Sequence, residues 1–185
     1  MGKSMSKMSL CEETTVLSAP LPAVEKWAVV WTKPRCERCV EEYFNRLNVP
    51  CFLPLVSKRQ IYKSGIKCWD SPLFSSYVFY DQDRIERHKV FESRKAVDIL
   101  LPPDPGALGR ELAQIALALG RDSSLREARF GQKGRRVNVI RGPMKGLRGE
   151  LVRIGSDCRL VLRVDFLGKA AELLIDESCV EPELD

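Results

Sequence analysis

The residues best suited to metal binding or catalysis are seven cysteines and a single histidine. Their spacing argues against a zinc site and gives little support to thiol exchange. Cys36 and Cys39 form a Cys-x-x-Cys pair, which in other settings binds zinc or exchanges a disulfide. No second pair with zinc spacing follows, and His88 is far away in the sequence, so no metal site is expected. A thiol-exchange site needs a strand that leads into the pair at a helix start, and Trp27 to Trp31 followed by Pro34 supplies one loosely. A redox enzyme therefore remains an alternative, although Cys36 also fits the apolar face of the predicted helix, where a buried thiol is ordinary.

Other catalytic groups are not visible in the sequence. The chain shows no set of nucleophile, base and orienting group, and no Gly-rich phosphate loop precedes a predicted helix. It also has no secretory segment and no run of about 18 apolar residues that would span a membrane. We therefore predict a non-enzymatic, cytoplasmic protein with reduced thiols and no cofactor.

The composition allows one core or two small ones, since the chain has 185 residues of which 44% are hydrophobic. The net charge of +5 permits contact with nucleic acid without requiring it. The charge is unevenly distributed: residues 121–169 carry 13 Lys and Arg against 5 Asp and Glu, a balance of +8. Residues 170–185 carry 6 acidic and no basic residues. A basic region followed by an acidic tail fits a nucleic-acid partner or an ordinary solvated surface.

The pattern along the chain predicts two domains. Residues 1–25 lack periodicity and are expected to form a disordered leader, and residues 121–130 are expected to form a linker between domains at 26–120 and 131–182. In the first domain, strands and helices are mixed in the order strand, helix, strand, hairpin, strand, helix, strand, helix. These elements are expected at 26–31, 34–48, 51–56, 58–70, 77–80, 83–93, 97–101 and 108–119. This order predicts an α+β sandwich in which helices cover the sheet.

The segment from Arg136 to Val152 predicts a hairpin of a small β-barrel. Its apolar residues alternate, pass through a Gly-Pro-x-x-Gly turn and alternate again. Gly142, Gly146 and Gly149 would permit positive φ or close backbone approach there. The same pattern matches the KOW motif, although any tight hairpin can use such a turn.

In this order, the two halves of the chain resemble the NusG transcription elongation factors. The resemblance covers roughly residues 25–182 and includes the opening WAVVW, the strand CFLP at 51–54, the segment PLFSSYVF at 72–79 and the KOW run. It implies an N-terminal NusG-type (NGN) α/β sandwich with an antiparallel sheet and a C-terminal SH3-like β-barrel KOW domain. The segments 48–54 and 72–79 look closer to specialised RfaH-type paralogues, whereas Ser75-Ser76 departs from the Pro-Gly of the general factor.

The resemblance also implies site residues and partners. RNA polymerase would be bound through its β′ clamp helices by Trp31, Tyr77 and Phe79, and through the β gate loop by His88. Non-template DNA would meet a helix face and its surroundings, made by Lys33, Arg35, Arg38, Tyr43 and Arg46. A ribosomal protein of the small subunit, or the termination factor Rho, would dock on Pro143, Met144 and Leu147. Aromatic residues on nearby strands could equally be core, and the charged helix face could simply be solvated.

The function implied is that of a monomeric elongation or antitermination factor that suppresses pausing or termination. An RNA-binding or ribosome-associated KOW protein is the main alternative, for which the aromatic residues would be core and binding would weaken steeply with salt. Some relatives refold the KOW domain into helices, but the strongly β-prone run LVLRVDF at 160–166 argues against this here.

Overall fold

The computed structural model describes residues 21–62, 65–121, 124–128 and 134–183. Most of the predicted leader, residues 1–20, lies outside the described residues. Leu21 and Val24, which precede the first strand, already pack against the main hydrophobic core. Packed residues are therefore present before the expected boundary at residue 25.

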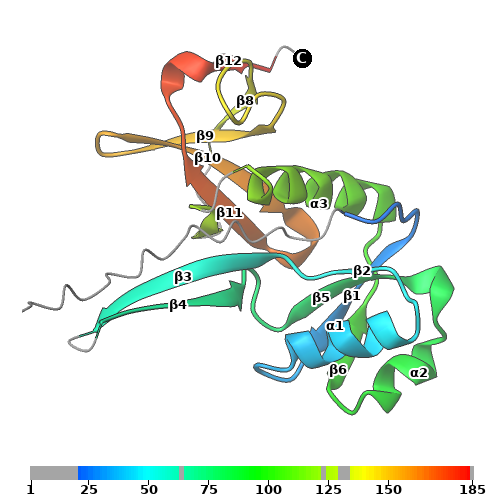
Figure 1. Cartoon of the computed structure of the whole chain (residues 1–185). Coiled ribbons are helices and arrows are strands. Elements are labelled where there is room, and N and C mark those ends of the chain that lie inside the picture. Colours follow the sequence, from blue (N-terminus) through cyan, green and yellow to red (C-terminus); the bar gives the residue numbers. More distant parts are fainter. Residues whose placement is uncertain (1–20, 63–64, 122–123, 129–133, 184–185) are drawn as a thin grey trace, which may run out of the picture.

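An antiparallel sheet of order β2-β5-β1-β6 forms the centre of the N-terminal domain (Figure 1). Its strands are β1 (Trp27–Thr32), β2 (Cys51–Phe52), β5 (Tyr77–Asp81) and β6 (Ala96–Leu100). The central strand β1 is apolar along nearly its whole length because helices cover both of its faces. Ala28 and Val30 point to one side of the sheet, and Trp27 and Val29 point to the other.

Three helices enclose this sheet. They are α1 (Glu37–Arg46), α2 (Arg87–Glu92) and α3 (Pro105–Leu119), with the short 3-10 turn η1 (Gln82–Arg84) before α2. Val40, Phe44 and Val90 bring α1 and α2 onto the Ala28 side, whereas α3 packs on the Trp27 side. The start of α3 is fixed by Asp104, whose side chain accepts a hydrogen bond from the Ala107 amide at 2.9 Å. The predicted α+β sandwich with an antiparallel sheet is confirmed for this domain.

A long hairpin projects from the domain (Figure 1). It consists of β3 (Leu55–Tyr62) and β4 (Gly65–Pro72), in which Lys58 lies opposite Trp69 and Ile61 lies opposite Ile66. The predicted hairpin at 58–70 is thus confirmed, while Lys63 and Ser64 of its tip fall outside the described residues.

The turn before β5 is held by an unusual pair of residues. Ser76 has φ +69°, a conformation that favours glycine and costs other residues about 1 kcal/mol. The Glu37 carboxylate, itself buried, accepts a hydrogen bond from the Ser76 amide at 2.6 Å. This contact from the start of α1 compensates for the absence of glycine and ties α1 to the turn.

We expect Ser76→Gly to raise the free energy of unfolding by about 0.5–1 kcal/mol, because glycine removes the cost of positive φ while keeping the amide donor. Denaturant unfolding of the full chain measures this change. Ser75→Gly is the matched control and should be neutral or destabilising. A loss of stability in Ser76→Gly would show that the hydroxyl, rather than the backbone, matters at this turn.

The C-terminal part is a six-stranded antiparallel sheet of order β12-β8-β9-β10-β11-β7. Its elements are β7 (Arg126–Ala128), β8 (Arg135–Val139), β9 (Arg148–Ile154), β10 (Asp157–Val164), η2 (Asp165–Leu167), β11 (Lys169–Leu174), η3 (Glu177–Cys179) and β12 (Val180–Pro182). Strand β7 lies inside the segment expected to be a linker and pairs with β11, so part of this segment belongs to the sheet. The edge strands β12 and β7 do not pair with each other among the described residues. The predicted closed SH3-like barrel is therefore not confirmed.

The predicted hairpin between Arg136 and Val152 is confirmed as the β8 and β9 pair. Gly142 and Gly146 adopt φ +79° and +93° in the connecting loop, as a tight turn requires. Gly149 allows close approach instead, because a Cβ there would lie 2.6 Å from the Val161 carbonyl oxygen.

Helix α3 lies between the N-terminal sheet and the C-terminal sheet (Figure 1). One continuous apolar cluster includes Leu112 of α3, Phe79 of the first sheet, and Leu160 and Leu162 of the second. The two parts of the chain are therefore packed together through α3.

Candidate functional site

Trp31 and Tyr77 form an aromatic pair at one end of the first sheet. They lie directly opposite each other on β1 and β5, on the same side of the sheet as Trp27 and α3. Trp31 is accessible to a partner, since its side chain is 45% exposed. Tyr77 is half-buried against the core. An exposed tryptophan anchored by a packed tyrosine has the composition typical of binding hot spots.

Phe79 does not belong to this surface. It is 0% exposed, and its ring centroid lies 6.4 Å from that of Phe52 and 6.5 Å from that of Phe74. The expectation that Phe79 contacts a partner is wrong for this structure, because two residues further along β5 from Tyr77 the sheet is already covered by its own core.

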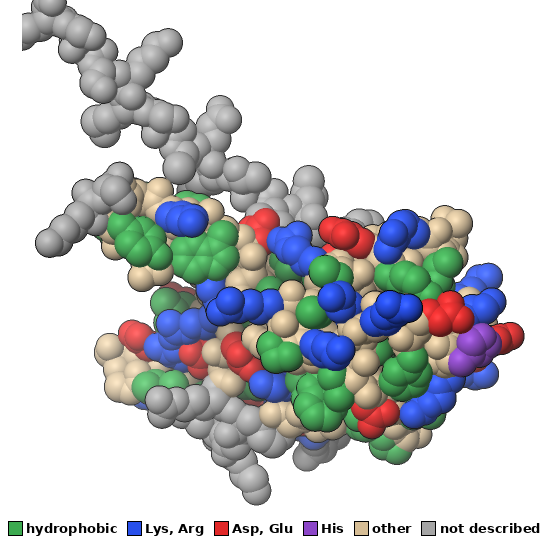
Figure 2. All heavy atoms as spheres, turned by 90° about the horizontal axis from the view of Figure 1, so that it is seen from below, with side chains coloured by type: hydrophobic (Ala, Val, Ile, Leu, Met, Phe, Trp, Pro, Cys, Tyr) green, Lys and Arg blue, Asp and Glu red, His purple; other side chains and the backbone are tan. Residues whose placement is uncertain are grey.

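The cationic residues expected to meet DNA do gather around α1. Lys33 donates from Nζ to the Arg94 carbonyl oxygen at 3.1 Å, and Arg38 lies 3.8 Å from the Asp70 carboxylate of β4. Arg35 is exposed and has φ +60° in the turn before α1. Figure 2 shows Lys and Arg side chains spread across the face on which α1 and α2 lie, with acidic side chains among them. This surface can attract phosphate, but it is a mixed rather than a uniformly basic face.

Tyr43 is less available than expected. Its hydroxyl donates to the Lys89 carbonyl oxygen at 2.8 Å, which joins α1 to α2, and the Arg46 guanidinium lies 6.0 Å from the ring centroid. Burial and the Glu92 carboxylate raise its pKa, so the phenol stays protonated. A nucleic-acid base that stacked on the ring face beside Arg46 would have to displace this guanidinium.

His88 lies on the opposite side of the sheet from Trp31 and Tyr77. It is exposed on α2 with Nδ1 3.2 Å from the Glu86 carboxylate, and α2 covers the sheet face opposite to α3. The histidine at the edge of the face in Figure 2 is His88, the single histidine of the chain. The exposed residues predicted to bind polymerase or DNA therefore form two surfaces. One is the aromatic pair, and the other is the α1–α2 face, which includes His88.

A third surface, the hairpin, contains aromatic residues that the sequence-based site prediction missed. Because residues paired across two strands share a face, Lys58, Tyr62, Lys67 and Trp69 lie on one side of it. Trp69 is 38% exposed and Tyr62 is 46% exposed. Aromatic rings can stack on bases while neighbouring cations pair with phosphates. The period-two alternation of these residues in β3 and β4 was the signal available in the sequence.

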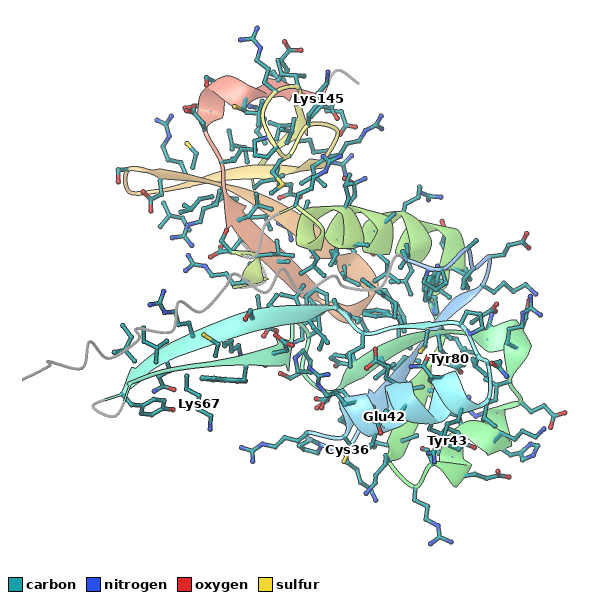
Figure 3. All side chains as sticks on the ribbon, viewed as in Figure 1. Cys36, Glu42, Tyr43, Lys67, Tyr80 and Lys145 are labelled. Carbon is teal, nitrogen blue, oxygen red and sulfur yellow. The ribbon has the colours of Figure 1, made fainter. Side chains whose placement is uncertain are left out.

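The turn of the KOW run presents fewer apolar atoms than expected. Pro143 and Lys145 are exposed, but Met144 is 5% exposed and Leu147 is 0% exposed. The prediction of Met144 and Leu147 as exposed partner contacts is therefore wrong here, because both side chains fill the core under the loop. Figure 3 shows Lys145 at the opposite end of the molecule from Tyr43, so this loop and the α1–α2 face are separate surfaces.

The cysteine pair lies at the start of α1, with Cys36 half-buried and Cys39 exposed. A third thiol, Cys51, is held protonated because burial and the Glu41 carboxylate raise its pKa to about 12. Among the residues that the structure describes, no three His, Cys, Asp or Glu side chains meet in a metal-binding group. Within the same ranges, no helix is long and apolar enough to cross a membrane.

Comparison with known proteins finds a family match in the N-terminal domain. Residues 25–115 match the family described as "Transcription termination factor nusG". No curated protein matches the chain. A solved structure described as "Domain interaction in Thermotoga maritima NusG" is 17% identical and covers 85% of this chain and 96% of that chain, with a TM-score of 0.46. Another, "Crystal Structure of MjSpt4:Spt5 complex conformation B", is 16% identical and covers 84% and 95%, with a TM-score of 0.26.

Proposed function

We propose that this protein is a cytoplasmic, non-enzymatic transcription elongation factor that binds RNA polymerase through its N-terminal domain and suppresses pausing or termination. The match of residues 25–115 to the NusG family carries this proposal. The aromatic pair supports it, since an exposed Trp31 beside Tyr77 offers an apolar anchor for a partner. The helix tips of the β′ clamp are the proposed partner of this pair.

Capture of purified core RNA polymerase by the immobilised full chain tests the proposal. The variant Trp31→Ala/Tyr77→Ala should lose most of the capture, because aromatic hot spots contribute about 2 kcal/mol or more each. Val97→Ala removes another exposed apolar side chain, on the edge strand β6, and should leave capture unchanged. Equal capture by a folded double variant and by wild type would refute the role of the pair.

A nucleic-acid contact is the second part of the proposal. The hairpin face that carries Tyr62, Lys67, Trp69 and Lys58, together with the Lys and Arg side chains around α1, favours single-stranded DNA near the polymerase. If the chain is instead an RNA-binding or ribosome-associated protein, it will bind RNA or ribosomes without polymerase, and Trp31→Ala/Tyr77→Ala will not reduce that binding. A requirement for one DNA sequence would indicate an operon-specific, RfaH-like factor rather than a general one.

The C-terminal sheet is proposed to be a KOW domain that docks a ribosomal protein of the small subunit or Rho. Its hairpin and loop glycines support this assignment. In the packed arrangement, Pro143 and Lys145 are the exposed residues of the loop apex, flanked by Gly142 and Gly146. Docking that uses Met144 or Leu147 would require the loop to rearrange.

A further inference from the structure

The aromatic pair lies at the end of the ladder between β1 and β5. Trp31 and Tyr77 are the last residues that these two strands hold in register. On the other edge of β1, the register with β6 shifts between Trp31 and Thr32. The ends of ladders open more readily than their middles, and a bulge changes the direction of nearby side chains. The geometry of the pair therefore depends on what holds the chain just beyond it.

Ser76 is the residue just beyond the pair, and both of its backbone polar groups are held. Its carbonyl oxygen accepts a hydrogen bond from the Thr32 amide at 2.8 Å, and its own amide donates to the Glu37 Oε1 atom at 2.6 Å. The first bond comes from β1, whereas the second comes from α1, which covers the side of the sheet opposite to the aromatic pair. Glu37 therefore supports the turn from behind the sheet and leaves the aromatic surface open.

Glu37 is a buried carboxylate with little else to bind. It is 5% exposed and is the first residue of α1. Within the described part of the chain, its side chain forms no ion pair, and the bond to Ser76 is its one hydrogen bond. The other buried glutamate, Glu172, pairs with two arginines. Burying a carboxylate without a cation costs free energy, which the positive end of the helix dipole offsets in part. A charged side chain buried for one backbone contact indicates that this contact has a specific role.

We propose that Glu37 is a positioning residue for polymerase binding: it fixes Ser76, and through Ser76 it holds Trp31 and Tyr77 in the geometry that the partner meets. This inference rests on the proposed function of the aromatic pair. Glu37 is buried and does not touch the partner itself. A pair that is already in place binds without the cost of being ordered. Without the bond from Glu37, the end of the ladder opens and the pair has to be ordered on binding, so affinity falls while the fold remains.

The dissociation constant for core RNA polymerase, measured on full-chain variants together with urea unfolding, tests this role. Glu37→Ala should weaken binding on the order of tenfold, because the pair is no longer ordered in advance. Glu37→Gln keeps an acceptor oxygen for the Ser76 amide and should stay within about threefold of wild type. Glu42→Ala, at an exposed position of the same helix, is the matched control and should bind as wild type.

A double variant separates positioning from stability. Ser76→Gly removes the cost of the positive φ at this turn, so Glu37→Ala/Ser76→Gly should recover part of the stability that Glu37→Ala loses. The amide of residue 76 is still not held in the double variant, and glycine gives the backbone more freedom, so binding should stay weak. A residue that only stabilised the fold would restore binding together with stability. If Glu37→Ala does not fold, the double variant takes its place in the binding measurement.

A second measurement needs no polymerase. The steady-state ¹H–¹⁵N NOE reports fast motion of individual N–H groups, and it should fall for the Trp31 indole and the Tyr77 amide in Glu37→Ala but not in Glu37→Gln. The indole of Trp27, which is 2% exposed at the other end of β1, is the internal control and should not change. If wild type does not bind polymerase, the proposed function fails, and the NOE alone decides whether Glu37 holds the pair.

Three results would overturn the positioning role. The first is a folded Glu37→Ala variant with wild-type affinity or with an unchanged NOE at Trp31 and Tyr77. The second is a double variant that regains full affinity together with its stability. The third is an equal loss of affinity in Glu37→Gln and Glu37→Ala, which would assign the effect to the charge rather than to the hydrogen bond with Ser76.

Discussion

Replacing Phe79 with alanine should lower the free energy of unfolding by about 3–5 kcal/mol, the usual cost of emptying an aromatic core position. The residue is fully buried between Phe52 and Phe74 and belongs to the cluster that continues through α3 into the C-terminal sheet. Neighbouring side chains are fixed by two sheets and a helix, so collapse into the cavity should be limited. Denaturant unfolding followed by circular dichroism measures the loss.

The matched control for this prediction is Ile61→Ala on the hairpin. Ile61 is 75% exposed, so its truncation should change stability by no more than about 0.5 kcal/mol. A Phe79→Ala variant that is as stable as wild type but no longer binds polymerase would reinstate Phe79 as a contact residue. A large loss of stability assigns its role to the core.

Replacing Glu172 with glutamine should also cost about 3–5 kcal/mol, because it leaves a cation at a largely buried position without its counter-charge. Glu172 is 8% exposed and pairs with Arg159 of β10 and with Arg126 of β7, the latter at 2.8 Å. Without it, the one carboxylate left near Arg159 among the described residues is that of Asp157, at 3.8 Å. Thermal and denaturant unfolding measure this loss.

The control for Glu172 is Arg126, the exposed partner in its ion pairs with Arg126 and Arg159. The Arg126 side chain is 57% exposed, so Arg126→Ala should cost less than about 1 kcal/mol. This difference between the two variants tests the position of β7, since the sequence predicts a linker at Arg126. If Arg126→Ala were as damaging as Glu172→Gln, β7 would be more important to the sheet than its short pairing indicates.

Periodicity predicted the strands and helices of the N-terminal domain well because each element buries its own apolar pattern. The run WAVVW and the spacing of Val40 and Phe44 on α1 needed no tertiary information. Strand β7 was missed because Arg126 and Glu127 are polar, and the strand is defined by pairing with β11 and by the bond from Arg126 to Glu172. Such pairing depends on a residue 46 positions away and leaves no local signal.

The site prediction failed where it depended on the exposure of apolar side chains, which the sequence pattern does not specify. Trp31 and Phe79 point to the same side of the sheet, and only the position of α3 and the surrounding core decides that one is open and the other buried. Met144 and Leu147 were expected at an exposed tip, but the loop folds back over its own core. Residue type identified these positions as candidates for contact or core, whereas three-dimensional packing decides which side chains are exposed and which are buried.

The most direct test of the proposed function is site-specific photocrosslinking from position 31. A photoreactive phenylalanine analogue replaces Trp31 in the full chain, and the same analogue replaces Ile154 on the C-terminal sheet as a control that is also exposed. With core RNA polymerase, we expect a crosslink from position 31 to the clamp helices of β′ and none from position 154 to that region. Crosslinks from position 31 that avoid β′, or that form only with ribosomes or RNA, would refute polymerase binding through Trp31.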